Sequence, residues 1–281
     1  MTAPTIAAPH DRVSTGEQLG ALVARNLRTT VRVPQLLMFS LTMPMAMLIL
    51  FSQVFHSVAD GPGFPSGVSY IDFLTPAMLA VTTVMAGTNA GVAAAIDHTN
   101  GLHDRFAALP MPAGLPGIAR TINETVFALG RAIILIGGAT ALGFRFHGDA
   151  VDAAAGLLVL VLLAGAMSAL FGRIGDRLRR PDVVQFAGMM VMMPFMFVSS
   201  AFAPLDTMPG WMRALAALNP VAHAADALRG NVLGTASVAD TLAAVTAAVA
   251  LWILVTVIPD PSRRRRAAGR PDPQASAGRT A

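Results

Sequence analysis

The sequence predicts an all-α integral membrane protein with six transmembrane helices and both termini in the cytoplasm. Three observations predict this class. Hydrophobic residues make up 54% of the 281 residues and charged residues 13%, about half of the charged share usual in soluble domains. Six segments are apolar and long enough to cross a bilayer. The arginines gather in alternate connections, which sets the orientation of the spans.

Residues 1–33 are expected to form a cytoplasmic segment, since they lack the apolar core of a signal peptide. Ser14 and Glu17 have the spacing of a capping box, which marks a helix start. Apolar residues then recur at helical spacing from Leu19 to Val31, and the arginines lie elsewhere on the wheel. We expect an amphipathic helix on the inner membrane surface. A solvated helix with a few exposed leucines is the alternative.

A membrane domain is expected over residues 34–258. An apolar helix of about 20 residues crosses the roughly 30 Å of bilayer hydrocarbon. Six segments qualify, near residues 34–55, 74–96, 122–143, 153–172, 183–203 and 242–258.

The second and third spans are joined by "GLHDRFAALPMP", residues 101–112. Apolar residues at i, i+4 and i+7 make one stripe, and a proline stops the helix. We expect a short amphipathic helix over about residues 98–110 that docks into a groove on a peripheral partner. A plain interfacial connector is the alternative. The candidate contact residues are Leu102, Asp104, Arg105, Phe106, Leu109 and Pro110.

The third span carries Asn123, Glu124 and Arg131. Glu124 and Arg131 are seven residues apart and therefore share a helix face. An ionised group costs about 2.5 to 3.5 kcal/mol in the middle of the membrane, so neither should face lipid. The functional interpretation is that this face lines the subunit interior or a transport path. The alternative is structural: Glu124 snorkels to water or pairs with Arg120, and Arg131 has a fixed partner.

The fifth span contains several methionines around Pro194. Flexible thioether side chains suit a surface that accepts varied apolar ligands, and ordinary core filling is the alternative. The candidates for a substrate path are Met189, Met193 and Met196. In the second span, Gly87 and Gly91 match the GxxxG pattern of closely packed helices.

The connection after the fifth span runs over residues 204–237 and is long for a helix bundle. Its pattern predicts two short amphipathic helices over about residues 205–237, on the outer face, where they would cover an exit. The alternative is a passive pair anchored by its tryptophan at the membrane interface. The candidate outer-gate residues are Asp206, Pro209, Trp211, Asn219 and Pro220.

All 20 basic residues are arginine, and sixteen fall on one side of this topology against three on the other. Cytoplasmic loops keep an excess of basic residues, so both termini and the 101–112 stretch are expected in the cytoplasm. Residues 259–281 form a basic cytoplasmic tail that we expect to be disordered, with its arginines against anionic lipid. The distribution argues against nucleic acid as a partner.

Missing residue types exclude several chemistries. Without lysine there is no Walker A loop for nucleotide phosphates and no Schiff base. Without cysteine there is no thiolate metal site, and the sequence has no HExxH, GxSxG or paired aspartate-rich motif. We therefore expect a transport subunit without catalytic residues, cofactor or metal, with any ATP and its Mg²⁺ on a separate ATPase chain.

Two stretches, "GLHDRFAALPM" and "SSAFAPLDTMPGWMRALAALNPVAHAADALRG" at residues 199–230, resemble the permease of ABC-2 type exporters. The similarity is to the daunorubicin/doxorubicin resistance branch and covers about residues 15–258. It departs from the family pattern at Ala107, where a basic residue is common, and at Ile96, where an acidic residue is common.

The resemblance implies a six-span permease fold in the bacterial plasma membrane, which works as a dimer with two ATPase subunits. It also implies that the cytoplasmic helix is a coupling helix, that the N-terminal helix helps to seat the ATPase, and that the outer helices dip toward the membrane. The expected function is ATP-driven export of a hydrophobic or amphiphilic compound by a homodimer. The alternatives are a proton-coupled secondary carrier and an exporter of polysaccharide or lipid with the same fold.

Overall fold

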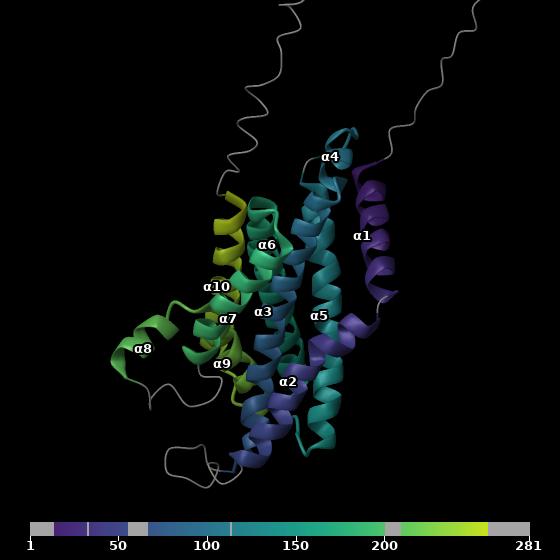
Figure 1. Cartoon of the computed structure of the whole chain (residues 1–281). Coiled ribbons are helices and arrows are strands. Elements are labelled where there is room, and N and C mark those ends of the chain that lie inside the picture. The colour runs from purple at the N-terminus through teal and green to yellow at the C-terminus, as the bar shows by residue number, and fades with distance from the viewer. Residues whose placement is uncertain (1–13, 33, 56–66, 113, 200–208, 258–281) are drawn as a thin grey trace, which may run out of the picture.

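The computed structural model describes residues 14–32, 34–55, 67–112, 114–199 and 209–257. Their regular secondary structure is entirely α-helical, which confirms the predicted class. The helices are α1 (Thr15–Val31), α2 (Pro34–Val54), α3 (Tyr70–Thr99), α4 (Leu102–Ala107), α5 (Leu115–Ala141), α6 (Ala150–Leu178), α7 (Pro181–Phe197), α8 (Gly210–Ala216), α9 (Pro220–Leu233) and α10 (Val238–Val257). The long helices run side by side in an elongated bundle (Figure 1).

Four of these helices, α3, α5, α6 and α10, are long and apolar enough to cross a membrane. They coincide with the predicted second, third, fourth and sixth spans. The predicted first span coincides with α2, where Met38–Val54 forms a shorter apolar helix. The fifth coincides with the 17 residues of α7, and the end of that predicted span lies outside the described residues. The chain is thus a multi-pass membrane helix bundle, and the count of six spans stays a prediction.

Local sequence signals explain where several helices begin. The predicted capping box is present at α1: the Ser14 hydroxyl accepts from the Glu17 amide at 3.3 Å, and the Glu17 carboxylate accepts from the Ser14 amide at 2.9 Å. Asp149 and Asp152 make the same reciprocal pair at the start of α6. Each pair satisfies backbone N–H groups that have no partner inside the helix.

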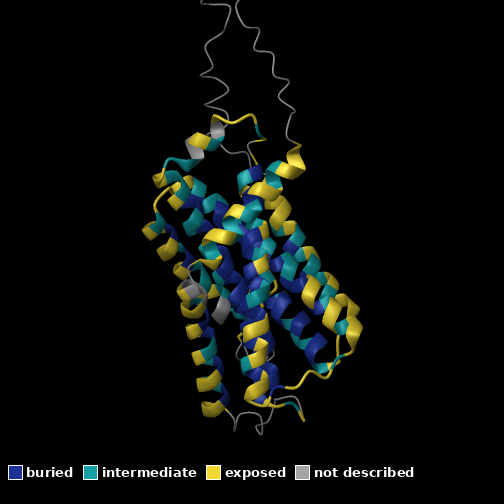
Figure 2. Cartoon of the chain, turned by 90° about the vertical axis from the view of Figure 1, so that its right-hand side faces the viewer, coloured by how far each residue is buried: buried dark blue, intermediate teal, exposed yellow. Residues whose placement is uncertain are grey.

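The core is built around α3, which is buried along most of its length (Figure 2). Its closest neighbour is α6, and glycines make the approach possible. A Cβ atom on Gly87 would lie 2.8 Å from the backbone of Met167, and one on Gly91 would lie 2.6 Å from the carbonyl oxygen of Phe171. From α6, Gly175 faces the carbonyl of Gly91. The GxxxG prediction is confirmed as close helix approach within this chain.

The two short helices after α7 have different environments. α9 lies inside the bundle against α3, α6 and α10, with an alanine-rich buried face that includes Ala222 and Ala225. α8 projects from the bundle (Figure 1) and leaves Trp211, Leu215 and Leu218 exposed. Only one of the two expected outer helices is therefore a surface element.

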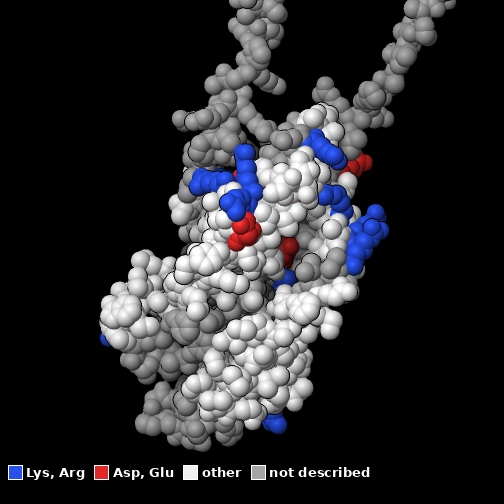
Figure 3. All heavy atoms as spheres, viewed as in Figure 1, with Lys and Arg blue, Asp and Glu red and all other residues white. Residues whose placement is uncertain are grey.

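On the face shown in Figure 3, charged side chains are concentrated toward one end of the bundle, which we call the charged end. The beginning of α1, the end of α10 and all of α4 lie at the same end (Figure 1). Charged side chains gather toward this end on the face shown in Figure 3, above a broad uncharged surface.

The apolar stripe of α1 packs on protein. Leu22 is buried against Leu115 and Ala119 at the beginning of α5, with Phe106 and Met111 beside them. Neither the interfacial nor the solvated interpretation of α1 included this contact, because both treated the helix alone. The position of α1 relative to the bilayer stays a prediction.

Candidate functional site

The helix predicted over residues 98–110 is shorter in the structure. Residues 98 and 99 belong to the last turn of α3, and Gly101 takes a left-handed backbone conformation with φ +65° that separates α3 from α4. A residue with a Cβ is strained in this conformation, so Gly101 sets the boundary. The expected boundaries of the coupling helix were therefore wrong at both ends, since α4 ends at Ala107.

The candidate contact residues of α4 divide into anchored and exposed side chains. Leu102 and Phe106 are half-buried, and Phe106 packs against the cluster around Leu22. The guanidinium carbon of Arg25 lies 5.5 Å from the centre of the Phe106 ring, a cation–π contact between α1 and α4. Arg105, Leu109 and Pro110 are exposed. The side chain of Asp104 lies outside the described part of the structure.

Next to this cluster on α5, Arg120 links α5 to α3 and α6. Its Nη2 lies 3.0 Å from Asp97 on α3, and its Nη1 lies 3.6 Å from Asp176 on α6. His98 adds a contact of 3.3 Å to the same Asp176 carboxylate. The Arg120 side chain is 10% exposed, so the two carboxylates compensate a largely desolvated charge.

Sequence reasoning missed this cluster. It had considered Arg120 only as a partner for Glu124, whereas the ion pairs of Arg120 are with Asp97 and Asp176. The three residues are far apart in the sequence but lie near the ends of neighbouring helices at the charged end of the bundle. Opposite charges near predicted helix ends mark them as candidates, but no spacing rule pairs these residues across helices.

Deeper in α5, Glu124 and Arg131 pair with each other. Arg131 Nη2 lies 3.6 Å from Glu124 Oε2, and the two side chains are 4% and 10% exposed for Arg131 and Glu124 respectively. Asn123 donates to the other Glu124 oxygen at 3.5 Å. Both ionised groups therefore lie in the interior of the chain. This excludes a snorkelling Glu124 and gives Arg131 the fixed partner of the structural interpretation.

The methionines of α7 divide between core and surface. Met192 packs against the core, but Met189 is 56% exposed and Met193 is 53% exposed. Core filling within this chain therefore does not explain Met189 and Met193. The side chain of Met196 lies outside the described part of the structure.

Asn219 connects α7 to α9. Its Nδ2 donates to the carbonyl oxygens of Phe195 at 2.9 Å and Val198 at 3.1 Å, and its Oδ1 accepts from the Val221 amide at 2.9 Å. The amide thus satisfies backbone groups at one helix end and one helix start. The remaining outer-gate candidates have different positions: Pro220 begins α9, Pro209 and Trp211 are exposed, and Asp206 lies outside the described residues.

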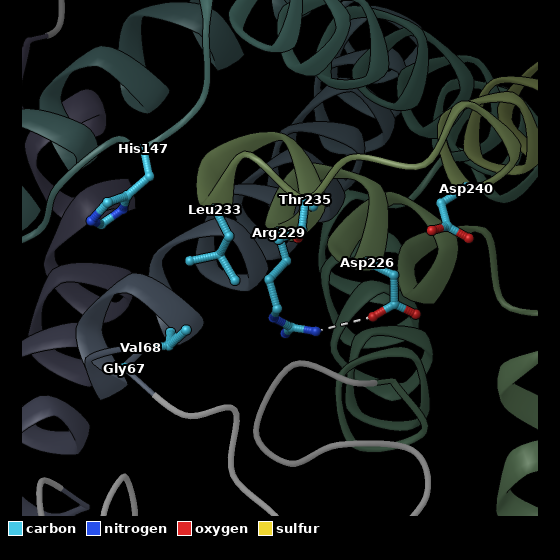
Figure 4. A pocket seen from close by; sticks show the side chains of 9 residues that line it. Gly67, Val68, His147, Asp226, Arg229, Leu233, Thr235 and Asp240 are labelled. Atoms are coloured by element: carbon cyan, nitrogen blue, oxygen red, sulfur yellow. Dashed lines mark hydrogen bonds and ion pairs between the residues drawn. The ribbon is translucent and has the colours of Figure 1, made fainter.

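Near α9 there is a pocket of about 680 Å³, lined by residues that include His147, Asp226 and Arg229 (Figure 4). Arg229 points into it toward Asp226, at 3.0 Å, and its guanidinium lies 3.8 Å from the centre of the Phe73 ring. Burial lowers the pKa of Arg229 to about 10, so it stays charged at neutral pH. Sequence reasoning counted Arg229 only as an outer arginine. Among the described residues no three His, Asp or Glu side chains are placed to hold a metal ion.

Comparison with known proteins gives consistent matches. The sequence model of a family described as "ABC-2 type transporter" matches residues 17–233. A daunorubicin resistance ABC transporter permease protein, DrrB1 of Streptomyces coeruleorubidus, is 32% identical over 197 residues, which cover 69% of this chain and 67% of that protein. The probable doxorubicin resistance ABC transporter permease protein DrrC of Mycobacterium tuberculosis is 23% identical over 195 residues, 69% of each chain. The putative transport permease ycf38 of Pyropia yezoensis is 24% identical over 214 residues, 76% of this chain and 73% of that one.

Proposed function

Because the chain belongs to the ABC-2 type transporter family and is a membrane permease subunit of an ABC exporter, we propose that it moves a hydrophobic or amphiphilic compound out of the cell. The compound class includes drugs, antibiotics and lipid-like molecules. The names of the relatives from Streptomyces and Mycobacterium support this class. We assign the substrate path to the apolar surface of α7, on which Met189 and Met193 are exposed.

The proposed topology has six spans, with α4 and both termini in the cytoplasm of a bacterial cell and the protein in its plasma membrane. Two observations support it. The beginning of α1, the end of α10 and α4 lie at one end of the bundle (Figure 1), and the charged side chains of Figure 3 gather toward that end. α2 and α7 are the two spans added to the four long apolar helices.

The proposed partners are two ATPase subunits, which bind ATP and Mg²⁺, and a second copy of this permease in a homodimer. This chain binds no cofactor in the proposal. The observation that carries it is the position of α4. It joins α3 to α5 at the charged end, is held on one side by Phe106 and presents Arg105 outward. Leu109 is exposed in the turn that follows it. A peripheral subunit that moves α4 would therefore act on two long helices at once.

Copurification and energy dependence test the proposal. We expect a tagged chain, coexpressed with its proposed ABC ATPase partner, to retain that ATPase in detergent and to export daunorubicin only while ATP is supplied. Leu109→Arg should weaken retention, whereas Leu178→Arg, which adds the same charge at the exposed last residue of α6, is the control. Export that survives ATP depletion and stops when the proton gradient collapses would instead establish a secondary carrier.

A further inference from the structure

Arg120 occupies a distinctive position between the charged end of the bundle and its core. It follows Ala119, which is buried in the cluster shared by α1, α4 and α5. The Arg120 guanidinium forms ion pairs with Asp97 on α3 and Asp176 on α6. Ala119, which belongs to the cluster that holds α4, and Arg120, which pairs with α3 and α6, are thus adjacent residues of α5.

The chemistry of this contact favours arginine. A guanidinium presents several N–H donors in a rigid plane, and here Nη2 and Nη1 each approach a different carboxylate. Loss of either partner would leave a poorly solvated charge without compensation, which is strongly unfavourable. The three helix ends therefore move together while both ion pairs are intact.

A second arrangement is available on the same helix. Glu124 is one turn from Arg120, at the i, i+4 spacing that permits an ion pair, and it is at present paired with Arg131. Arg120 therefore has two sets of carboxylates within reach, one on α3 and α6 and one on α5 itself. Because Glu124 is held by Arg131, the ion pairs of Arg120 with Asp97 and Asp176 are the ones that link the three helices.

We propose that Arg120 is the positioning residue through which movement of α4 reaches α3 and α6. The inference depends on the proposed function, since a partner ATPase must supply that movement. Displacement of α4 passes through Phe106 to Leu115 and Ala119 on α5. The ion pairs of Arg120 then pass it to the two neighbouring helices. Arg120 contacts no cargo in this scheme.

Transport measured against ATP hydrolysis tests the proposal. In inside-out vesicles that contain the permease and its ATPase, with daunorubicin as the probe, R120Q should retain the ATPase and hydrolyse ATP within about twofold of wild type. Daunorubicin moved per ATP should fall about tenfold, a typical size for coupling between sites. R177Q, which removes an exposed charge next to Asp176, should leave both rates unchanged. The exchange variant D97R/R120D should recover part of the lost transport.

A distance measurement gives a readout that is independent of the cargo. Because the chain has no cysteine, spin labels attach only at Ile118→Cys and Leu178→Cys. Dilution of the labelled chain with unlabelled chain leaves one labelled copy per dimer, so that the measured distance is the separation of α5 and α6. We expect nucleotide trapping to leave this distance unchanged in the wild type and to change it in R120Q. D97N and D176N, which each keep one ion pair, should give intermediate coupling if R120Q does not fold.

Three results would overturn the inference. One is wild-type transport per ATP in R120Q, D97N and D176N. Another is a parallel loss of ATPase retention, hydrolysis and export, which would indicate a docking or folding role. The third is a distance between labels 118 and 178 that responds to nucleotide equally in wild type and R120Q. A wild-type chain that retains no ATPase would refute the proposed function itself, and that result is distinct from all three.

Discussion

The contact between α3 and α6 yields the sharpest stability prediction. In Gly87→Ala, the new Cβ would lie 2.7 Å from the Met167 Cβ and 2.8 Å from the Met167 carbonyl carbon and oxygen, whereas ordinary van der Waals contact begins at 3.4 Å. Backbone atoms cannot change rotamer to make room. The helices must therefore separate locally by several tenths of an ångström, which weakens dispersion contacts between the two helices.

Overpacking of this kind costs about 1 to 3 kcal/mol, so the folded-to-unfolded ratio of Gly87→Ala should fall roughly 5- to 150-fold. Reversible denaturation by sodium dodecyl sulfate in mixed micelles, followed by circular dichroism, measures the change in unfolding free energy. Gly137→Ala in α5 is the matched control, because a Cβ there meets no atom within 4 Å. The control should be neutral or slightly stabilising, since alanine has the higher helix propensity. Equal stability of the two variants would refute the reasoning.

Three further predictions concern polar contacts. Asn219→Ala removes two hydrogen bonds to the end of α7 and one to the first turn of α9, and should lower the unfolding free energy by about 1 to 3 kcal/mol in the same micelle assay. An unchanged value would mean that water replaces the amide. Arg131→Leu leaves buried Glu124 without its partner and should destabilise the protein by about 3 to 5 kcal/mol. The double variant E124Q/R131L should recover most of this loss. Normal export by the double variant would exclude the pair from the transport mechanism. The hydrogen bonds from Ser14 lower the pKa of Glu17. The stability that Glu17 gives to α1 is therefore present above the ordinary carboxyl pKa and is lost as the pH falls through the lowered pKa. Protection of the first-turn amides of α1 from hydrogen exchange should drop over that acid range in the wild type and should not depend on pH in Glu17→Gln.

Features that depend on a few consecutive residues were predictable from the sequence. The capping box of Ser14 and Glu17 sets the beginning of α1 by contacts within three residues. The predicted spans likewise coincide with α2, α3, α5, α6, α7 and α10, because a long apolar run is recognisable without knowledge of its neighbours. The boundary of α4 was missed although its cause is local. Gly101 was read as part of a helix, and its left-handed conformation interrupts that helix.

Features that depend on distant residues were not predictable. The partners of Arg120 come from α3 and α6, and no spacing rule links them to α5. The burial of α9 was also missed. Its buried face is made largely of alanines such as Ala222, Ala224 and Ala225, so it shows little hydrophobic contrast with the exposed face. The sequence pattern indicated a surface helix, and close packing against three neighbours determined the actual position.

The position of α9 has a consequence for leakage. A loop that merely covered an exit would open by thermal motion at little cost, and the membrane would lose its permeability barrier whenever it did so. α9 is instead embedded among α3, α6 and α10, and the Asn219 amide fixes its first turn. Its displacement requires the surrounding helices to part, so an opening at this end would require work on the whole bundle.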